Sequence, residues 1–211
     1  DGIRDRDVTG VQTCALPIFG ITEEGQWVQL ESADDFVTGT DGLPYVPKST
    51  HVLNIDVHGI KNAQGNNLKI DLAFPLLHGA YGEDGTIQGL FEMADIAYVG
   101  SGVLASAVAM DKTFAKPIYA DFGLKVADGI TIHEREWKIN KALERAKISA
   151  LGFPVFVKPA RSGSSRGTSK VKSESEIDKA IEEAHRHDPR AMVEVAIVGR
   201  EIECAVLEIN G

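Results

Sequence analysis

The stretch Phe153–Val171 constrains the fold most strongly, because it joins a short apolar run to a loop of small residues. The run Val155–Val157 is β-branched and aromatic, which is typical of a buried strand. Lys158 follows this run, and the loop Gly163–Gly167 separates it from a second extended run. The sequence therefore predicts a strand, a glycine–serine loop and a second strand, with a lysine where the first strand ends.

A loop of this kind can direct several backbone N–H groups toward one point, which suits a phosphate, and a neighbouring lysine adds a point charge. A plain β-hairpin with a solvated lysine explains the loop alone equally well, since Gly/Ser turns are common. The stretch is not a Walker A loop, because no Gly-Lys-Ser/Thr closes it and a strand follows it. The choice therefore depends on residues elsewhere in the chain.

Length and composition exclude several classes of protein. The 211 residues suffice for one large or two small domains, and the hydrophobic fraction of 43% is that of an ordinary globular protein. The net charge of −9 argues against a nucleic-acid surface. No apolar run reaches the roughly 18 residues of a membrane helix, so no membrane partner is expected. Cys14 and Cys204 indicate neither a disulfide framework nor a metal motif, which favours a reducing cytoplasm.

Residues 1–18 do not continue smoothly into the rest of the chain. They begin without Met and contain no apolar core of a cleavable signal peptide. This string resembles a translated sequencing-adapter remnant, and the alternative is a weakly structured natural N-terminus. We expect residues 1–18 to be a non-native leader, with native sequence beginning near Phe19 inside a domain whose first part is missing.

Residues 19–110 predict an α/β domain in which strands and helices alternate. Edge strands and loops are expected up to residue 67. The later elements are a buried strand Asp71–Leu77, a helix Ile87–Ala94 capped by Thr86, a short strand Tyr98-Val99 and a helix Val103–Met110.

Residues 111–190 predict a central α+β subdomain. Asp111 caps a helix from Lys112 that Pro117 should kink or shorten and that Gly123 ends. Two further helices are expected, Trp137–Ala150 and one that opens with a Ser173/Glu176 capping box. The apolar stripe of the latter consists of Ile177, Ala180, Ile181 and Ala184.

Residues 191–211 predict the start of a C-terminal subdomain. Two extended runs, Ala191–Val198 and Glu201–Ile209, lead to Asn210-Gly211, which is a type I′ hairpin signal. Because a hairpin turn needs a following strand, we expect the chain to stop in mid-domain.

A dinucleotide-binding motif is one competing interpretation. Gly100-x-Gly102-x-x-Ala105 fits G-x-G-x-x-A, and Asp121 follows at a suitable distance. However, Asp121 falls in a helical stretch and not at the end of a second strand. A tight strand-to-helix turn explains the glycines more simply.

A second group of residues suits a nucleotide better. Lys112 and Lys158 come from different elements around the loop Ser162–Gly167, as phosphate-binding lysines should. Glu194 lies in an extended segment whose backbone can meet an adenine edge, while its carboxylate accepts from the amino group. Glu201 could accept from ribose hydroxyls. Taken singly, each of these residues is more often a surface charge.

From residue 19 to 211 the chain resembles the D-alanine–D-alanine ligases, a family of the ATP-grasp superfamily. The resemblance therefore implies a partial N-terminal α/β domain followed by an incomplete ATP-grasp fold. The motifs that carry the resemblance are Phe74–Gly79, Gly82–Gly89, Tyr98–Ser106, Met110–Lys112, Val157–Gly167, Val193-Glu194 and Gly199–Glu201.

The resemblance also implies roles for single residues. Lys112 and Lys158 would hold the ATP phosphates, and the loop at Ser164 and Ser165 would close over the terminal phosphate. Ser164 would also help to position the first D-alanine, as a catalytic residue. The remaining implied contacts are adenine for Glu194 and the backbone near Ile197, ribose for Glu201, and the carboxylate of the first D-alanine for His78. A structural histidine at a strand end is the alternative for His78.

The implied function is ATP-dependent formation of D-alanyl-D-alanine for peptidoglycan synthesis through an acyl-phosphate intermediate. Mg²⁺ is expected in the full-length protein, and so is a homodimer formed through the N-terminal domain. The Mg²⁺ ligands and the catalytic arginine of the family have no counterpart here, so we expect no metal site and no ligase activity in these 211 residues. Another ATP-grasp carboxylate–amine ligase and a non-catalytic nucleotide-binding module remain alternatives, and D-lactate or D-serine is an alternative second substrate.

Overall fold

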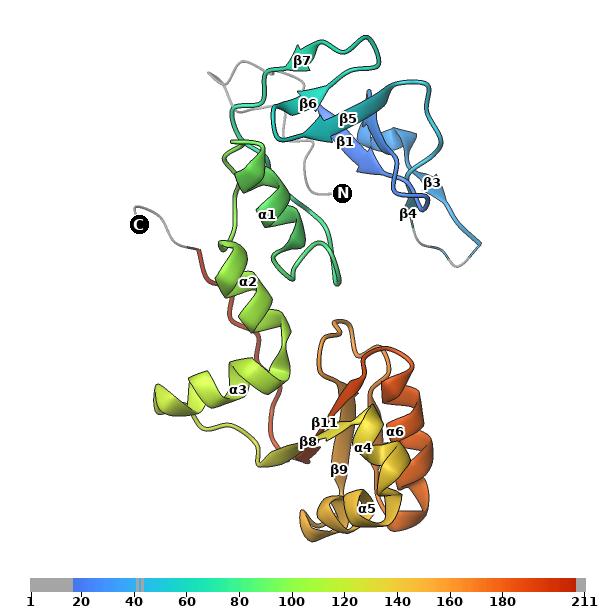
Figure 1. The fold of residues 1–211 in the computed structure, drawn as a ribbon, viewed down its shortest axis with the longest axis vertical. Helices are drawn as coiled ribbons and strands as arrows, with labels where there is room; N and C mark the ends of the chain where they lie inside the picture. The colour runs from blue at the N-terminus through green and yellow to red at the C-terminus, as the bar shows by residue number, and fades with distance from the viewer. Residues whose placement is uncertain (1–16, 41, 43, 208–211) are drawn as a thin grey trace. The chain divides into compact units, whose positions relative to one another are not determined.

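The computed structural model describes residues 17–40, 42 and 44–207 (Figure 1). Most of the expected leader 1–18 and the hairpin signal Asn210-Gly211 lie outside these residues. The described chain divides into two compact units. The first unit contains the residues up to Ala73 together with Leu90–Ala97, and the second contains Phe74–Gly89 and the residues from Tyr98 onward.

The first unit is built on an antiparallel five-stranded sheet with the order β1-β2-β5-β6-β7. Val28, Leu30, Leu53 and Ile60 are buried on it. A short 3-10 helix, η1 (Ala33–Asp35), and a separate two-stranded sheet of β3 and β4 complete the region before residue 50. The strands are β1 (Ile18–Ile21), β2 (Trp27–Leu30), β3 (Val37–Thr38), β4 (Pro44–Tyr45), β5 (Val52–Asp56), β6 (Gly59–Lys61) and β7 (Asn67–Leu68).

The prediction of a buried strand over Asp71–Leu77 is wrong. The Ala73 N–H donates to the Ala97 carbonyl oxygen at 2.8 Å, but the segment forms a single bridge and not a strand. The side chains of Phe74 and Leu76 are 65% and 74% exposed. An apolar run becomes a buried strand only where neighbouring strands pair with its backbone and cover its faces. Among the described residues no strand does so here, and the predicted strand at Tyr98-Val99 is likewise reduced to an isolated bridge.

Three helices follow: α1 (Thr86–Met93), α2 (Val103–Met110) and α3 (Lys112–Asp121). All three were predicted, although Thr86 is the first residue of α1 and not the residue before it, and its N–H donates to Asp84 Oδ1 at 3.0 Å. Asp111 caps α3 as predicted. Pro117 lies inside α3 but does not end it, and Gly123 follows with a φ of 78°.

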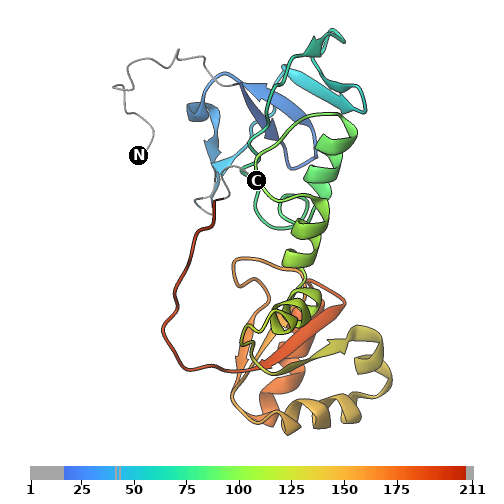
Figure 2. The same cartoon turned by 90° about the vertical axis from the view of Figure 1, so that its left-hand side faces the viewer.

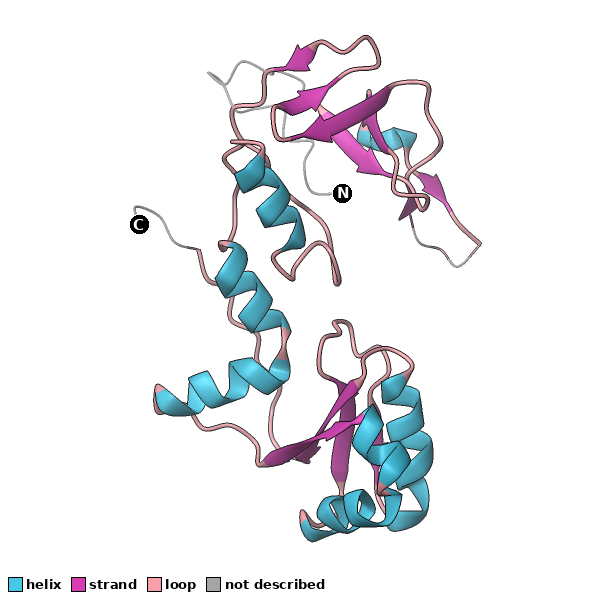
Figure 3. Cartoon of the chain, viewed as in Figure 1, coloured by secondary structure: helices cyan, strands magenta, loops and turns pink. Residues whose placement is uncertain are grey.

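The second unit contains an antiparallel four-stranded sheet with the order β10-β9-β11-β8. Three helices cover one face of this sheet, as Figure 3 shows by colour. The strands are β8 (Gly129–His133), β9 (Val155–Pro159), β10 (Ser169–Val171) and β11 (Arg190–Val195). The helices are α4 (Glu134–Ile139), α5 (Lys141–Ala150) and α6 (Ile177–His185), with the 3-10 turn η2 (Glu174–Glu176) before α6.

The predicted stripe of α6 is confirmed, since its four apolar residues are all buried against the sheet. The long predicted helix Trp137–Ala150 is divided, because Asn140 leaves helical geometry between α4 and α5. The predicted capping box is wrong: Ser173 makes no capping bond, and the Glu176 carboxylate instead accepts from the Lys172 N–H at 2.8 Å. The intervening turn η2 displaces the start of α6 from the predicted cap.

The extended run predicted to follow β11 forms no strand up to residue 207 (Figure 2). Ile202, Val206 and Leu207 are each at least 75% exposed. Its last residues, 208 and 209, lie outside the described part of the chain.

Candidate functional site

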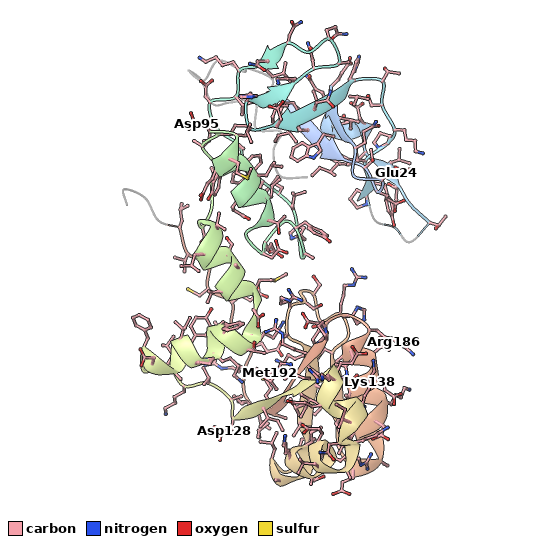
Figure 4. All side chains as sticks on the ribbon, viewed as in Figure 1. Glu24, Asp95, Asp128, Lys138, Arg186 and Met192 are labelled. Carbon is pink, nitrogen blue, oxygen red and sulfur yellow. The ribbon has the colours of Figure 1, made fainter. Side chains whose placement is uncertain are left out.

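One face of the second sheet carries both Lys158 and Glu194. Successive side chains of a strand point to opposite faces, and Val157 lies opposite Val193 on the face that packs against α4–α6. Lys158 and Glu194 therefore lie on the other face, together with Met192, which is labelled in Figure 4. Helix α3 contributes to this second face, as its contacts below show.

Glu194 bridges two lysines on this face. Lys158 Nζ forms an ion pair with Glu194 Oε1, and Lys116 Nζ lies 2.7 Å from Glu194 Oε2. Lys116 also donates to the Ala127 carbonyl oxygen at 2.6 Å. Burial opposes ionisation of Glu194, but the hydrogen bonds from Lys116 and Lys158 outweigh it and hold its pKa below the usual value. The carboxylate is thus ionised and has both oxygens occupied.

Lys112 lies at the base of the glycine–serine loop. Its Nζ donates to the Ser162 carbonyl oxygen at 2.7 Å, with longer contacts of 3.4 Å to the carbonyl oxygens of Pro159 and Ala160. Burial and the positive charge of Lys158 lower the pKa of Lys112. An anion placed between these two lysines would relieve their repulsion, so the electrostatics of the site favour a negatively charged ligand.

The loop holds two serines in the left-handed region, with φ of 47° at Ser164 and 56° at Ser165. A non-glycine residue in this conformation costs on the order of 1–3 kcal/mol, and such residues cluster at ligand-binding sites. The Arg166 N–H closes the loop onto the Gly163 carbonyl oxygen at 3.1 Å. Within the described chain, the N–H groups of Ser164 and Ser165 donate no hydrogen bond. They are therefore available to an anion, as the sequence suggested.

An ionic network fixes the start of α3 beside the sheet. Asp111 pairs with Arg190 of β11, and Arg190 Nη1 donates to Thr113 Oγ1 at 3.0 Å. Asp188 accepts from the Arg190 N–H at 2.8 Å and from Arg161 Nε at 2.6 Å. Asp111 and Asp188 are buried. The network joins the start of α3 to β11 and to Arg161, which follows β9.

The same junction places Lys112. Its backbone N–H donates to the Ala160 carbonyl oxygen at 3.1 Å, directly after β9. An isolated bridge between Asp111 and Arg161 runs alongside. Lys112 therefore reaches the loop from a helix whose first turn is held in place by charge and by backbone hydrogen bonds.

The structure brings Lys112, Lys158, the loop with Ser164 and Ser165, and Glu194 into one region. Within the described residues, no hydrogen bond or ion pair links His78, Ile197 or Glu201 to it. Ile197 is 72% exposed just beyond β11, and Glu201 lies exposed in the segment that forms no strand.

The sequence reasoning did not identify Lys116. One signal could have found it, because Lys112 and Lys116 are four residues apart on a predicted helix and therefore share a face. Arg190 and Asp188 carried no such local signal, since Asp111, the partner of Arg190, and Arg161, a partner of Asp188, both lie far away in sequence.

The dinucleotide interpretation of Gly100 and Gly102 is wrong. Gly102 caps α2, but Asp121 is the last residue of α3. The fingerprint needs that acidic residue at the end of a second parallel strand, where it meets the ribose.

Acid is expected to weaken the second unit through Asp111 and Glu194. Burial opposes the ionised form of Asp111, but hydrogen bonds from Thr113 and Arg190 hold its pKa below the usual 3.8. Burial also opposes ionisation of Glu194, and hydrogen bonds from Lys116 and Lys158 hold its pKa below the usual 4.5. A carboxyl group whose pKa is lower in the folded state than in the unfolded state stabilises the fold at any pH above its unfolded-state pKa. This contribution is lost as the pH falls through the folded-state pKa. Urea midpoints should therefore fall as pH is lowered below about 4.5. In a variant with Asp111→Asn and Glu194→Gln, the urea midpoint should depend less steeply on pH. An equally steep dependence would show that these two carboxylates do not cause the loss of stability in acid.

Among the described residues, no group of three or more His, Cys, Asp or Glu side chains gathers where a metal ion could bind. In the same residues, no helix is long and apolar enough to cross a membrane.

Two family models match this chain. Residues 9–101 match the D-ala D-ala ligase N-terminus, and residues 118–211 match the D-ala D-ala ligase C-terminus. The chain is 48% identical over 207 residues to the D-alanine–D-alanine ligase of Paenarthrobacter aurescens strain TC1, and 43% identical over 216 residues to that of Streptomyces coelicolor. These matches cover 93% and 92% of this chain but 54% of each relative. The chain thus spans about half the length of the curated relatives it matches.

Solved structures give the same result. The D-alanine–D-alanine ligase of Coxiella burnetii matches with a TM-score of 0.71 and 31% identity, over 87% of this chain and 54% of that structure. The VanG D-Ala:D-Ser ligase of Enterococcus faecalis matches with a TM-score of 0.70 and 34% identity, over 86% of this chain and 52% of that structure. Because sequence, both family models and fold agree, the chain belongs to the D-alanine–D-alanine ligase family of the ATP-grasp superfamily.

Proposed function

We propose that the full-length protein joins two D-alanine molecules at the expense of ATP, in the cytoplasm, to supply D-alanyl-D-alanine for peptidoglycan, and that the 211 residues alone have no ligase activity. The carboxylate of one D-alanine attacks the γ-phosphorus of ATP, forming an acyl phosphate and releasing ADP. The amine of the second D-alanine then attacks the acyl carbon, forms the amide and releases phosphate. The observation that carries this proposal is the convergence of Lys112, Lys158 and the Ser162–Gly167 loop beside Glu194, in a chain of this family.

The residues described above would act on ATP mainly through charge and position. Lys112 and Lys158 neutralise phosphate oxygens in a partly buried place, where such interactions are stronger than in water. The N–H groups of Ser164 and Ser165 close over the terminal phosphate, and Ser164 helps to position the first D-alanine. Glu194 accepts from the amino group of adenine. The phosphoryl group is thereby held in line with its nucleophile, which is the main task in phosphoryl transfer.

The remaining assignments belong to the same proposal. The backbone near Ile197 meets the adenine edge, Glu201 accepts from ribose, and His78 lies near the carboxylate of the first D-alanine. The N-terminal ligase domain covers residues 19–110, the central ATP-grasp subdomain 111–190, and a C-terminal subdomain begins at 191. Mg²⁺ and a homodimer belong to the proposal for the whole protein.

Ligation of D-serine to D-alanine is a second candidate. The likeness to the VanG D-Ala:D-Ser ligase favours it, because the two chains share 34% identity. Both candidates use the same ATP-binding face and differ only in the second substrate.

Nucleotide binding tests the proposed face directly. Replacing Lys158 with methionine should weaken ATP binding about tenfold or more, since a hydrogen bond to a charged group contributes about 1.5–3 kcal/mol. Binding by calorimetry is a suitable readout, because it measures ATP affinity without requiring turnover. Lys138→Met provides a matched control: the Lys138 side chain (labelled in Figure 4) is 68% exposed on α4 and pairs with the neighbouring Glu134. Equal ATP affinity in the two variants would contradict the proposal.

A further inference from the structure

Lys116 has no role in the function proposed so far, yet its ammonium group has two fixed partners on the candidate nucleotide-binding face. Its Nζ lies 2.7 Å from Glu194 Oε2 and 2.6 Å from the Ala127 carbonyl oxygen. The side chain is 18% exposed, against 24% for Lys158. It projects from the middle of α3, whose first turn is fixed by the Asp111–Arg190 ion pair. Lys116 is therefore held by its helix, by a loop carbonyl and by Glu194.

The carboxylate of Glu194 cannot keep both present partners when a nucleotide binds. If Lys158 moves to a phosphate, Glu194 Oε1 loses its cation and becomes able to accept a hydrogen bond. The amino group of adenine is a donor that suits this oxygen. Oε2 meanwhile stays on Lys116, whose second bond to Ala127 does not depend on the nucleotide.

We propose that Lys116 is a positioning residue for base recognition: it holds Glu194 by Oε2 while Oε1 is transferred from Lys158 to the amino group of adenine. This inference rests on the proposed nucleotide-binding function and adds the source of base specificity. The arrangement also couples the two ends of the ligand. The phosphate must first pair with Lys158, and only then is Glu194 Oε1 free to accept from the base. Without Lys116, Glu194 would turn toward Lys158 with both oxygens and compete with the phosphate.

The test compares ATP with purine riboside triphosphate, which lacks the 6-amino group, on the full 211-residue chain. The unchanged chain should bind ATP about tenfold more tightly than the deamino analogue, the difference expected of one hydrogen bond to a charged group. In Lys116→Met this ratio should fall toward one, and Lys116→Arg should restore part of it. A merely structural role would weaken both nucleotides by the same factor and leave the ratio unchanged, which would overturn the inference. Lys138→Met is the matched control and should keep the ratio.

A double-variant cycle shows whether Lys116 acts through Glu194. Glu194→Leu removes the acceptor and should by itself bring the affinity ratio of ATP to the deamino analogue to one, so that Lys116→Met has no further effect on it. This double variant also removes both partners of the ion pair, so it stays informative if Lys116→Met alone folds poorly. If the affinity ratio of ATP to the deamino analogue were lower in the double variant than in the Glu194 variant, the inference would be contradicted. Failure of the unchanged chain to bind either nucleotide would overturn the proposed function and this inference together, whereas ATP binding with an unaltered ratio in Lys116→Met overturns the inference alone.

Discussion

Replacing Arg190 with methionine is expected to lower the free energy of unfolding of the second unit by about 3 kcal/mol. Removing one partner of a buried ion pair typically costs about 3–5 kcal/mol, because the other charge stays buried without compensation. The lower end applies here, since Asp111 keeps its bonds from Thr113 and Asp188 keeps Arg161. The guanidinium also lies 5.7 Å from the centre of the Phe114 ring, and this contact is lost as well.

The surface offers a matched control for this change. The side chain of Arg186 (labelled in Figure 4) is 74% exposed and pairs with Glu183, so Arg186→Met should change the unfolding free energy by less than about 1 kcal/mol. Urea titration of both variants measures the difference. Asp111→Asn combined with Arg190→Met should cost less than the sum of the two single changes, because neither charge is then left alone. Equal losses for Arg190 and Arg186 would show that the network contributes little.

The network also bears on ATP. Lys112 follows Asp111 directly, and its N–H is bonded to Ala160. Weakening the start of α3 therefore loosens a lysine that we assign to the phosphates. Under conditions where Arg190→Met remains folded, its ATP affinity should fall, while that of Arg186→Met should not.

Local patterns predicted those elements whose geometry depends on near neighbours in sequence. The period of Ile177, Ala180, Ile181 and Ala184 matches one face of a helix, and the sheet buries that face. Strand β9 was recognisable because its apolar run precedes a loop of small residues. The convergence of Lys158 and Glu194 came from the resemblance to a known family, since no local rule joins residues so far apart.

Other features depended on pairing that no local pattern contains. Strand β8 was not predicted, because Gly129–His133 is short and acquires its strand character from β11 alone. The run Asp71–Leu77 has strand composition but finds no partner strand among the described residues. Left-handed backbone at Ser164 and Ser165 was not predicted either, because serine seldom adopts it without tertiary support.

Replacing Ile181 with alanine is expected to destabilise the second unit by about 2–5 kcal/mol. The side chain is fully buried in the cluster that holds α6 on the sheet, and its removal leaves a cavity in addition to the lost burial. The same change at Ile139, whose side chain is 70% exposed at the end of α4, should cost less than about 1 kcal/mol.

Fluorescence can assign this loss to the second unit. Trp137 belongs to the same core cluster as Ile181, whereas Trp27 lies on β2 of the first unit. In a Trp27→Phe background, emission reports on Trp137 alone, and its urea midpoint should fall sharply in Ile181→Ala but not in Ile139→Ala. A midpoint that is unchanged in both would mean that α6 does not stabilise the sheet. Because β9 and β11 carry Lys158 and Glu194 on the opposite face of that sheet, such a result would also remove the physical basis for a preorganised nucleotide-binding face.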